Sequence, residues 1–255
     1  MFLLLTLISY SFPIGMHLSY DVNVEFEGYL PVLRGRQSLA NLAMTVDVVG
    51  LTPDADGNPR IVSEIKALKL KFNGAVMPFG PENVNTFFPK TTIEASLLGK
   101  LLKTDAPNIS LPVRLPGLDV KRFPDITYLP IEFPKEGIEE GKPFKFKKLF
   151  GDGPVEYEVT PTKIRSDAVS LTLKLSQSYV TFEDDRKSPT DEANAAMRIE
   201  TELKGTGTAT FDVKRGLITE FNIEAVSSGQ AIDLKTKSQV ERKLKTTLKV
   251  VLSAQ

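Results

Sequence analysis

Apolar and polar side chains alternate along this chain over stretches much longer than an ordinary strand of about 5–6 residues. From Leu18 to Glu27 every even position is apolar and every odd position is polar, which is typical of a strand with one buried side. Long antiparallel strands of this kind must curl to bury their apolar face. The pattern therefore predicts a mainly β fold, in which long antiparallel strands form a strongly curved sheet, a half-open barrel or a sandwich, with one or two short helices. It returns around residues 40–48, 68–72, 169–175, 197–213, 217–225 and 240–252.

The first twenty residues carry no charged side chain. A short apolar run, Phe2–Ile8, is followed by small side chains at Ser9 and Ser11, which is typical of a secretory signal peptide over about residues 1–15. A buried first strand is the alternative interpretation. The run is too short to cross a membrane as a helix, so we expect an exported protein (periplasmic, cell-envelope or secreted) and not an integral membrane protein.

One segment has helical spacing. Thr91 and Glu94 are spaced as in a capping box, and four leucines follow at intervals of three and four residues. These are Leu97, Leu98, Leu101 and Leu102. They predict a helix over 92–103 whose apolar stripe lies on the sheet or covers a cavity, at the end of an N-terminal β region spanning 16–103.

Prolines dominate residues 104–154, where they recur every few positions. Because proline removes a backbone donor and is excluded from interior strands, this stretch predicts an extended connector that crosses the surface, with short edge strands. It would separate the N-terminal region from a C-terminal antiparallel β region, residues 155–255. Whether the two regions share one domain stays open at this stage.

Composition excludes several classes of protein. With 32 basic and 32 acidic residues the net charge is zero, which gives no global field for holding nucleic acid. There is no cysteine, and His17 is the single histidine, so thiolate chemistry, histidine-rich metal sites and a serine–histidine–aspartate triad lack their residues. A hydrolase that uses carboxylates alone would need two acids facing one cleft, whereas the alternation directs them outward. We therefore expect no enzyme activity, no cofactor and no metal.

The loop from Pro53 to Pro59 contains an Asp-x-Asp-x-Asn spacing that invites a calcium interpretation. An EF-hand loop needs glycine at its sixth position and glutamate at its twelfth, and these positions are Pro59 and Ile65. A plain turn is the better prediction.

Side chains become small along one face of residues 197–211. Glycine in a strand usually marks a bend or a close approach of backbone, and the alternative is a concave face hollowed for an apolar guest. In that second interpretation the inward set is uncharged and suits a lipid or another hydrophobic ligand. The predicted ligand-binding residues are Met197, Thr201, Leu203, Gly205, Gly207, Ala209 and Phe221, with Leu98 and Leu102 from the expected helix.

The segment from Gly205 to Ile218 suggests a weak family resemblance. Its G-x-[GA]-x-F-D-x-x-x-G-x-[IV] pattern, with the upstream proline-rich stretch Leu129–Gly137, resembles a hairpin of uncharacterised exported β-rich bacterial proteins. The similarity covers about residues 128–252 and implies no catalytic residue. A looser likeness of shape, a curved sheet with a covering helix, is to periplasmic lipoprotein carriers.

The sequence thus predicts a non-enzymatic exported protein that binds a hydrophobic ligand or lipid on a concave sheet face. The alternative is a structural or assembly module of the cell envelope, which acts through protein–protein contacts at a sheet edge or the proline-rich connector.

Overall fold

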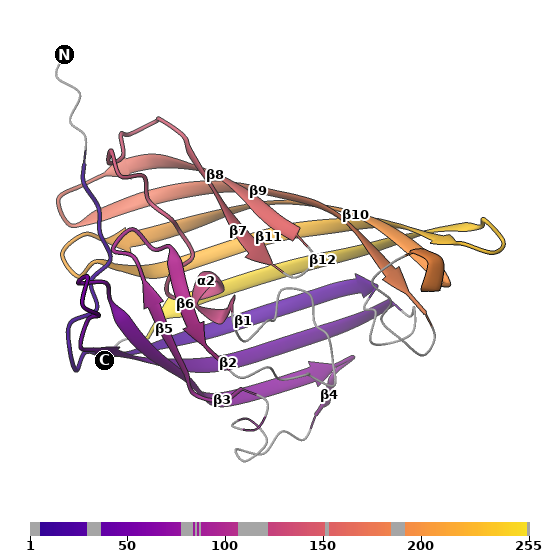
Figure 1. Cartoon of the computed structure of the whole chain (residues 1–255), viewed down its shortest axis with the longest axis horizontal. Coiled ribbons are helices and arrows are strands. Elements are labelled where there is room, and N and C mark those ends of the chain that lie inside the picture. The colour runs from indigo at the N-terminus through magenta and orange to yellow at the C-terminus, as the bar shows by residue number, and fades with distance from the viewer. Residues whose placement is uncertain are drawn as a thin grey trace.

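The computed structural model describes residues 6–29, 37–77, 84, 86, 88–106, 122–150, 153–184 and 192–253. Twelve strands form one antiparallel sheet, in the order β6-β5-β3-β2-β1-β12-β11-β10-β9-β8-β7, with the short β4 beside β3. The sheet stays open, because β6 and β7 end the order without pairing to each other. The prediction of a mainly β fold built from long antiparallel strands is confirmed (Figure 1).

Several strands are long enough to run the length of the molecule (Figure 1). The elements are β1 (His17–Tyr29), β2 (Gln37–Leu51), β3 (Arg60–Phe72), β4 (Ala75–Val76), β5 (Thr91–Ala95), β6 (Leu101–Asp105), α2 (Phe123–Ile126), β7 (Phe144–Phe150), β8 (Gly153–Ile164), β9 (Ala168–Glu183), the 3-10 turn η3 (Glu192–Asn194), β10 (Met197–Asp212), β11 (Leu217–Asp233) and β12 (Gln239–Leu252).

The alternation in the sequence becomes an inside and an outside of the curved sheet. On β1 the even positions from Leu18 to Phe26 are buried and the odd positions are mostly exposed. The first and last long strands pair, with Val22 opposite Val250. The N-terminal and C-terminal β regions are therefore two parts of one sheet, and their apolar residues belong to one core cluster.

Two non-strand segments fill the concave side at one end of the sheet. From residues 6–16, Tyr10 and Phe12 pack into the core, and the Tyr10 hydroxyl donates to the carbonyl oxygen of Ile131 at 3.1 Å. From residues 122–133, Tyr128 and Phe133 are buried as well. The rings of Tyr10, Phe133 and Phe211 lie 5.1–5.7 Å apart, centroid to centroid. We call these two segments, 6–16 and 122–133, the plug.

The plug bears on both interpretations of the N-terminus. Ile8, Tyr10 and Phe12 are buried in the core, as the alternative of a buried first segment predicts. The segment is extended and forms one isolated bridge, between Thr6 and Ile138, rather than a full strand. Export itself stays a prediction.

The predicted helix over 92–103 is wrong. The segment is a hairpin, in which β5 pairs with β6 and Gly99 occupies the tight turn with a φ of 91°. Thr91, Ile93 and Ala95 are all buried, so the period of two in this segment outweighs the helical spacing of its leucines.

The predicted surface path of the connector is also wrong for residues 122–133. This stretch runs through the interior, because its apolar side chains Tyr128, Leu129 and Ile131 are fully buried between the hairpin and the sheet. Its predicted short edge strand exists as β7, while residues 107–121 lie outside the described part of the chain.

Candidate functional site

The predicted ligand-binding strip follows the concave face of β10 and β11. Ala209 and Phe221 face each other in register and are buried under the plug. Further along β10 the inward positions Gly207, Gly205, Leu203 and Thr201 are only partly buried, whereas the next inward residue, Ile199, is buried again and Met197 at the start of the strand is partly buried. The plug therefore covers one end of the strip, and the stretch from Thr201 to Gly207 is more accessible.

The glycines of the strip have a backbone reason. A Cβ on Gly207 would collide with the carbonyl oxygen of Asn222 and with the Cδ1 atom of Ile223. A Cβ on Gly205 would lie 2.8 Å from both the Cβ of Ala225 and the carbonyl oxygen of Glu224. Close approach of β11 thus requires glycine at both positions, which supports the interpretation as a bend rather than a hollow at these two residues.

The two leucines predicted to cover the strip lie elsewhere. Leu98 is in the β5–β6 turn, where it packs against the core and its carbonyl accepts the Phe133 N–H at 2.9 Å. Leu102 is 49% exposed on the edge strand β6. Leu98 therefore touches the covered end of the concave face, and Leu102 is not part of the strip.

One hollow lined by the plug residue Phe123 is small. A hollow between Ser63, Phe88 and Phe123 has a volume of about 20 Å³, which is room for about one water molecule. This hollow has no room for a lipid.

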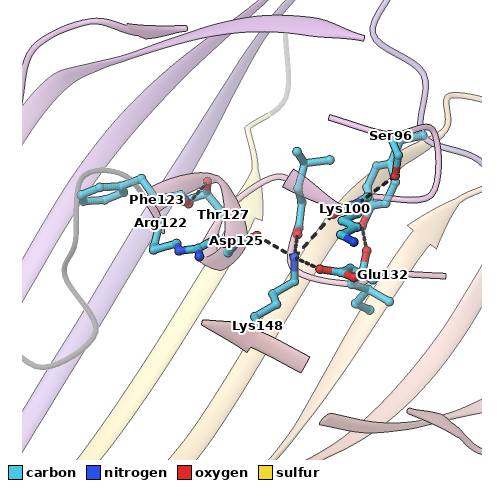
Figure 2. A network of polar contacts seen from close by, with 12 residues as sticks. Ser96, Lys100, Arg122, Phe123, Asp125, Thr127, Glu132 and Lys148 are labelled. Carbon is cyan, nitrogen blue, oxygen red and sulfur yellow. Dashed lines mark hydrogen bonds and ion pairs between the residues drawn. The ribbon is translucent and has the colours of Figure 1, made fainter. Parts of the chain in front are cut away.

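The plug also holds a cluster of charges, which the sequence analysis missed (Figure 2). The Lys148 ammonium contacts Asp125 at 2.6 Å and Glu132 at 3.5 Å, and donates to the carbonyl oxygen of Leu129 at 3.0 Å. Arg122 contacts the other oxygen of Asp125 at 3.1 Å. The side chains of Lys148 and Asp125 are each 1% exposed. We call these four residues the buried cluster.

The buried cluster joins the two edges of the open sheet. Lys148 comes from the edge strand β7, and its ammonium also reaches the carbonyl oxygen of Gly99, in the turn before the other edge strand β6, at 3.5 Å. Burial raises the pKa of Glu132, and the Lys148 ammonium partly offsets this. The sequence carried a signal for this lysine, because Phe144, Phe146 and Phe150 place position 148 on the same inward face.

A second pair of charges spans the concave face at the open end. Arg242 on β12 contacts Glu183 on β9 at 3.1 Å, and its guanidinium lies 4.1 Å from the ring centroid of Tyr29. Three strand spacings, about 14 Å, separate β12 from β9, so the two side chains meet across the concave side. Burial raises the pKa of Tyr29, and Arg242 partly offsets this.

The calcium-like loop and the single histidine, which the sequence analysis also considered, form no site in the part of the chain that the structure describes. The Asp54 carboxylate accepts the backbone N–H groups of Asp56 and Asn58 at 2.9 and 2.8 Å, which closes the predicted turn. His17 lies exposed at the start of β1. Among the described residues, no group of three or more His, Cys, Asp or Glu side chains is arranged to hold a metal ion. Nor does any described helix have the length and apolar character needed to cross a membrane.

Comparison with known proteins adds a likeness of fold. No protein-family model matches the chain, and no curated protein matches it. Among solved structures, one of lipovitellin, concerned with lipid–protein interactions, aligns with a TM-score of 0.58 at 11% sequence identity. The alignment covers 96% of this chain and 26% of the lipovitellin chain, so this chain spans about a quarter of that protein. At this identity the comparison shows a shared fold alone.

Proposed function

We propose that this protein binds a lipid or similar hydrophobic ligand on the open part of its concave sheet face, and that it acts as a binding protein rather than an enzyme. One observation carries the proposal. The inward positions Thr201, Leu203 and Gly205 remain partly exposed, whereas their counterparts under the plug are fully buried. An apolar ligand laid over this strip would bury surface that the plug leaves accessible.

The likeness to a structure solved for its lipid–protein interactions supports the same proposal, since an open, curved antiparallel sheet is a scaffold on which lipid can lie. The absence of cysteine and the single histidine support a binding role over catalysis. The two acids that do converge, Asp125 and Glu132, are occupied by the Lys148 ammonium.

Native mass spectrometry of gently purified protein tests the proposal. We expect a lipid-sized mass adduct that is lost when Leu203 is replaced by aspartate, because a charge on the inward strip opposes an apolar ligand. Thr208→Asp, which places the same charge on the exposed side of β10, should retain the adduct. Loss of the adduct in both variants, or a wild-type chain that never carries lipid, contradicts the proposal.

Action as an assembly module of the cell envelope is the second candidate. The two edge strands of the sheet each present an exposed leucine, Leu102 on β6 and Leu149 on β7, and an unpaired edge can accept a partner's strand. Crosslinking in cells tests this candidate. A reproducible protein neighbour that disappears on Leu149→Lys supports it, and crosslinking unchanged by that substitution counts against it.

Export to the periplasm, envelope or medium is part of the proposal. The intact mass of the mature protein tests it and locates any cleavage. Cleavage between residues 11 and 17 would remove Tyr10, whose ring lies in the core, so such a product should be less stable than the full chain.

A further inference from the structure

The concave face changes character from row to row across β12, β11, β10 and β9. Under the plug, one row of four facing residues is wholly apolar and buried, and consists of Val250, Phe221, Ala209 and Leu171. The row that includes Thr201, eight residues before Ala209 on β10, is mostly polar, and most of its members are partly exposed. It consists of Arg242, Gly229, Thr201 and Tyr179. The rows are about 27 Å apart along the strand, so the strip runs from an apolar row to a polar row, beyond which Ile199 and Ala231 are buried again.

The Arg242 guanidinium in this polar row has one terminal nitrogen without a strong hydrogen-bond acceptor. One terminal nitrogen of Arg242 donates to the Glu183 carboxylate, while the other points to the thioether sulfur of Met197 at 3.7 Å. A thioether is a weak acceptor, and an arginine fork is built to bind two carboxylate oxygens. The second nitrogen can therefore gain a stronger partner than it has.

Two glycines and an aromatic ring lie close to this arginine. Gly229 lies directly beside Arg242 on β11, and a Cβ at this position would lie 3.5 Å from the side chains of Ile199 and Thr201. Gly28 on β1 has a φ of 127°, and the next residue, Tyr29, stacks on the guanidinium. The aromatic ring lowers the cost of holding the cation on a half-buried surface.

We infer that the site takes a long-chain carboxylate, whose chain lies along Leu203, Gly205 and Gly207 and whose head group binds Arg242 in place of the Glu183 carboxylate. This inference rests on the proposed function and adds the chemical class of the ligand. Glu183 shows that a carboxylate fits here, and at 37% exposed its side chain is free to turn to solvent, whereas Arg242 is 14% exposed. In the unliganded protein, Glu183 fills the head-group position.

Titration with oleate and with oleyl alcohol, which share a chain and differ in head group, tests the inference. We expect oleate to bind roughly tenfold more tightly than the alcohol, a difference of one charge-assisted contact. Arg242→Gln should abolish that preference. Glu183→Gln, which removes the competing carboxylate, should strengthen oleate binding several-fold without changing alcohol binding. Lys243→Gln, on the outer face of the same strand, is the matched control and should change neither.

The outcomes separate the two proposals. If neither probe binds the wild-type chain, the proposed lipid function fails and the inference fails with it. If both probes bind equally and the Arg242 and Glu183 variants change neither affinity, lipid binding stands and the head-group assignment is overturned. Because Glu183→Gln is expected to strengthen binding, its effect cannot be mistaken for a loss of folding.

Discussion

The two charge clusters of the concave face both pair basic with acidic side chains, but they differ in burial and in their position on the sheet. The buried cluster joins Lys148 to three residues of the plug, keeps Lys148 and Asp125 almost completely out of contact with water, and connects both edges of the sheet. The Arg242–Glu183 pair lies at the open end, with Glu183 in contact with solvent. A buried charge that loses its partner is very costly, whereas a partly hydrated pair can exchange partners at little cost. The first cluster therefore stabilises the fold, and the second is the one that we propose meets a ligand.

Removing one charge from each cluster tests this difference most strongly. Lys148→Ala leaves Asp125 and Glu132 without their shared cation and should cost about 3–5 kcal/mol of unfolding free energy. Arg242→Ala should cost about 1 kcal/mol or less. Urea unfolding of both variants measures the contrast, with Lys147→Ala on the outer face of β7 as control. Equal losses of unfolding free energy in Lys148→Ala and Arg242→Ala would contradict a structural role for the first cluster alone.

Truncating a plug side chain tests whether the covered end depends on the N-terminal segment. Tyr10→Ala removes a ring that packs on Phe133 and Phe211 and should lower stability by about 3–5 kcal/mol. Tyr10→Phe keeps the ring and loses only the bond to the Ile131 carbonyl, so it should cost about 1 kcal/mol. Thermal unfolding compares the two. A negligible effect of Tyr10→Ala would show that the fold does not need residues 6–16.

Substitution of Gly207 tests how closely β10 and β11 are packed on the strip, with a smaller expected loss of stability. Gly207→Ala forces a Cβ onto the Asn222 carbonyl and the Ile223 side chain, and should destabilise the fold by about 1–3 kcal/mol. Thr208→Ala, on the opposite face, should stay within about 0.5 kcal/mol of the wild type. Chemical denaturation gives both values. A neutral Gly207→Ala would instead indicate unfilled space at this position.

The pH dependence of the buried cluster is the smallest expected effect. Because burial raises the pKa of Glu132 above 4.5, the folded chain keeps this proton at pH values where the unfolded chain has lost it. The ionised carboxylate therefore weakens the fold above the folded pKa, and the penalty disappears as the pH falls towards the unfolded value.

Glu132→Gln should accordingly stabilise the protein at pH 8 and have little effect at pH 4. Urea titrations at the two pH values, with the exposed Glu136→Gln as control, measure this difference. A destabilising Glu132→Gln at pH 8 would mean that the attraction to Lys148 outweighs the cost of burial.

The strands were predictable because their signal is local. Alternation from Leu18 to Glu27, or along Met197 to Phe211, reflects only which side of a strand is wet. The turn from Asp212 to Gly216 was predictable for the same reason, since the Asp212 carboxylate accepts the Arg215 N–H and Gly216 has a φ of 68°. Such features need no knowledge of the rest of the chain.

The plug was not predictable because its packing is not local. Leu129 and Ile131 sit in a proline-rich stretch whose interior path depends on the hairpin and sheet around it. The leucines at 97–102 satisfied helical spacing, but the β5–β6 turn and the pairing of β5 with β3 decided the structure. The Arg242–Glu183 pair joins residues 59 positions apart, so its existence follows only from the curl of the sheet.

Site-specific photocrosslinking tests the central claim most directly. A photoreactive amino acid replaces either Leu203, on the concave strip, or the neighbouring Lys204, on the outer face, and the irradiated protein is weighed by mass spectrometry after incubation with vesicles containing oleate. The account predicts a covalent lipid adduct at position 203 and none at position 204. Equal labelling at both positions, or labelling at 204 alone, would contradict it.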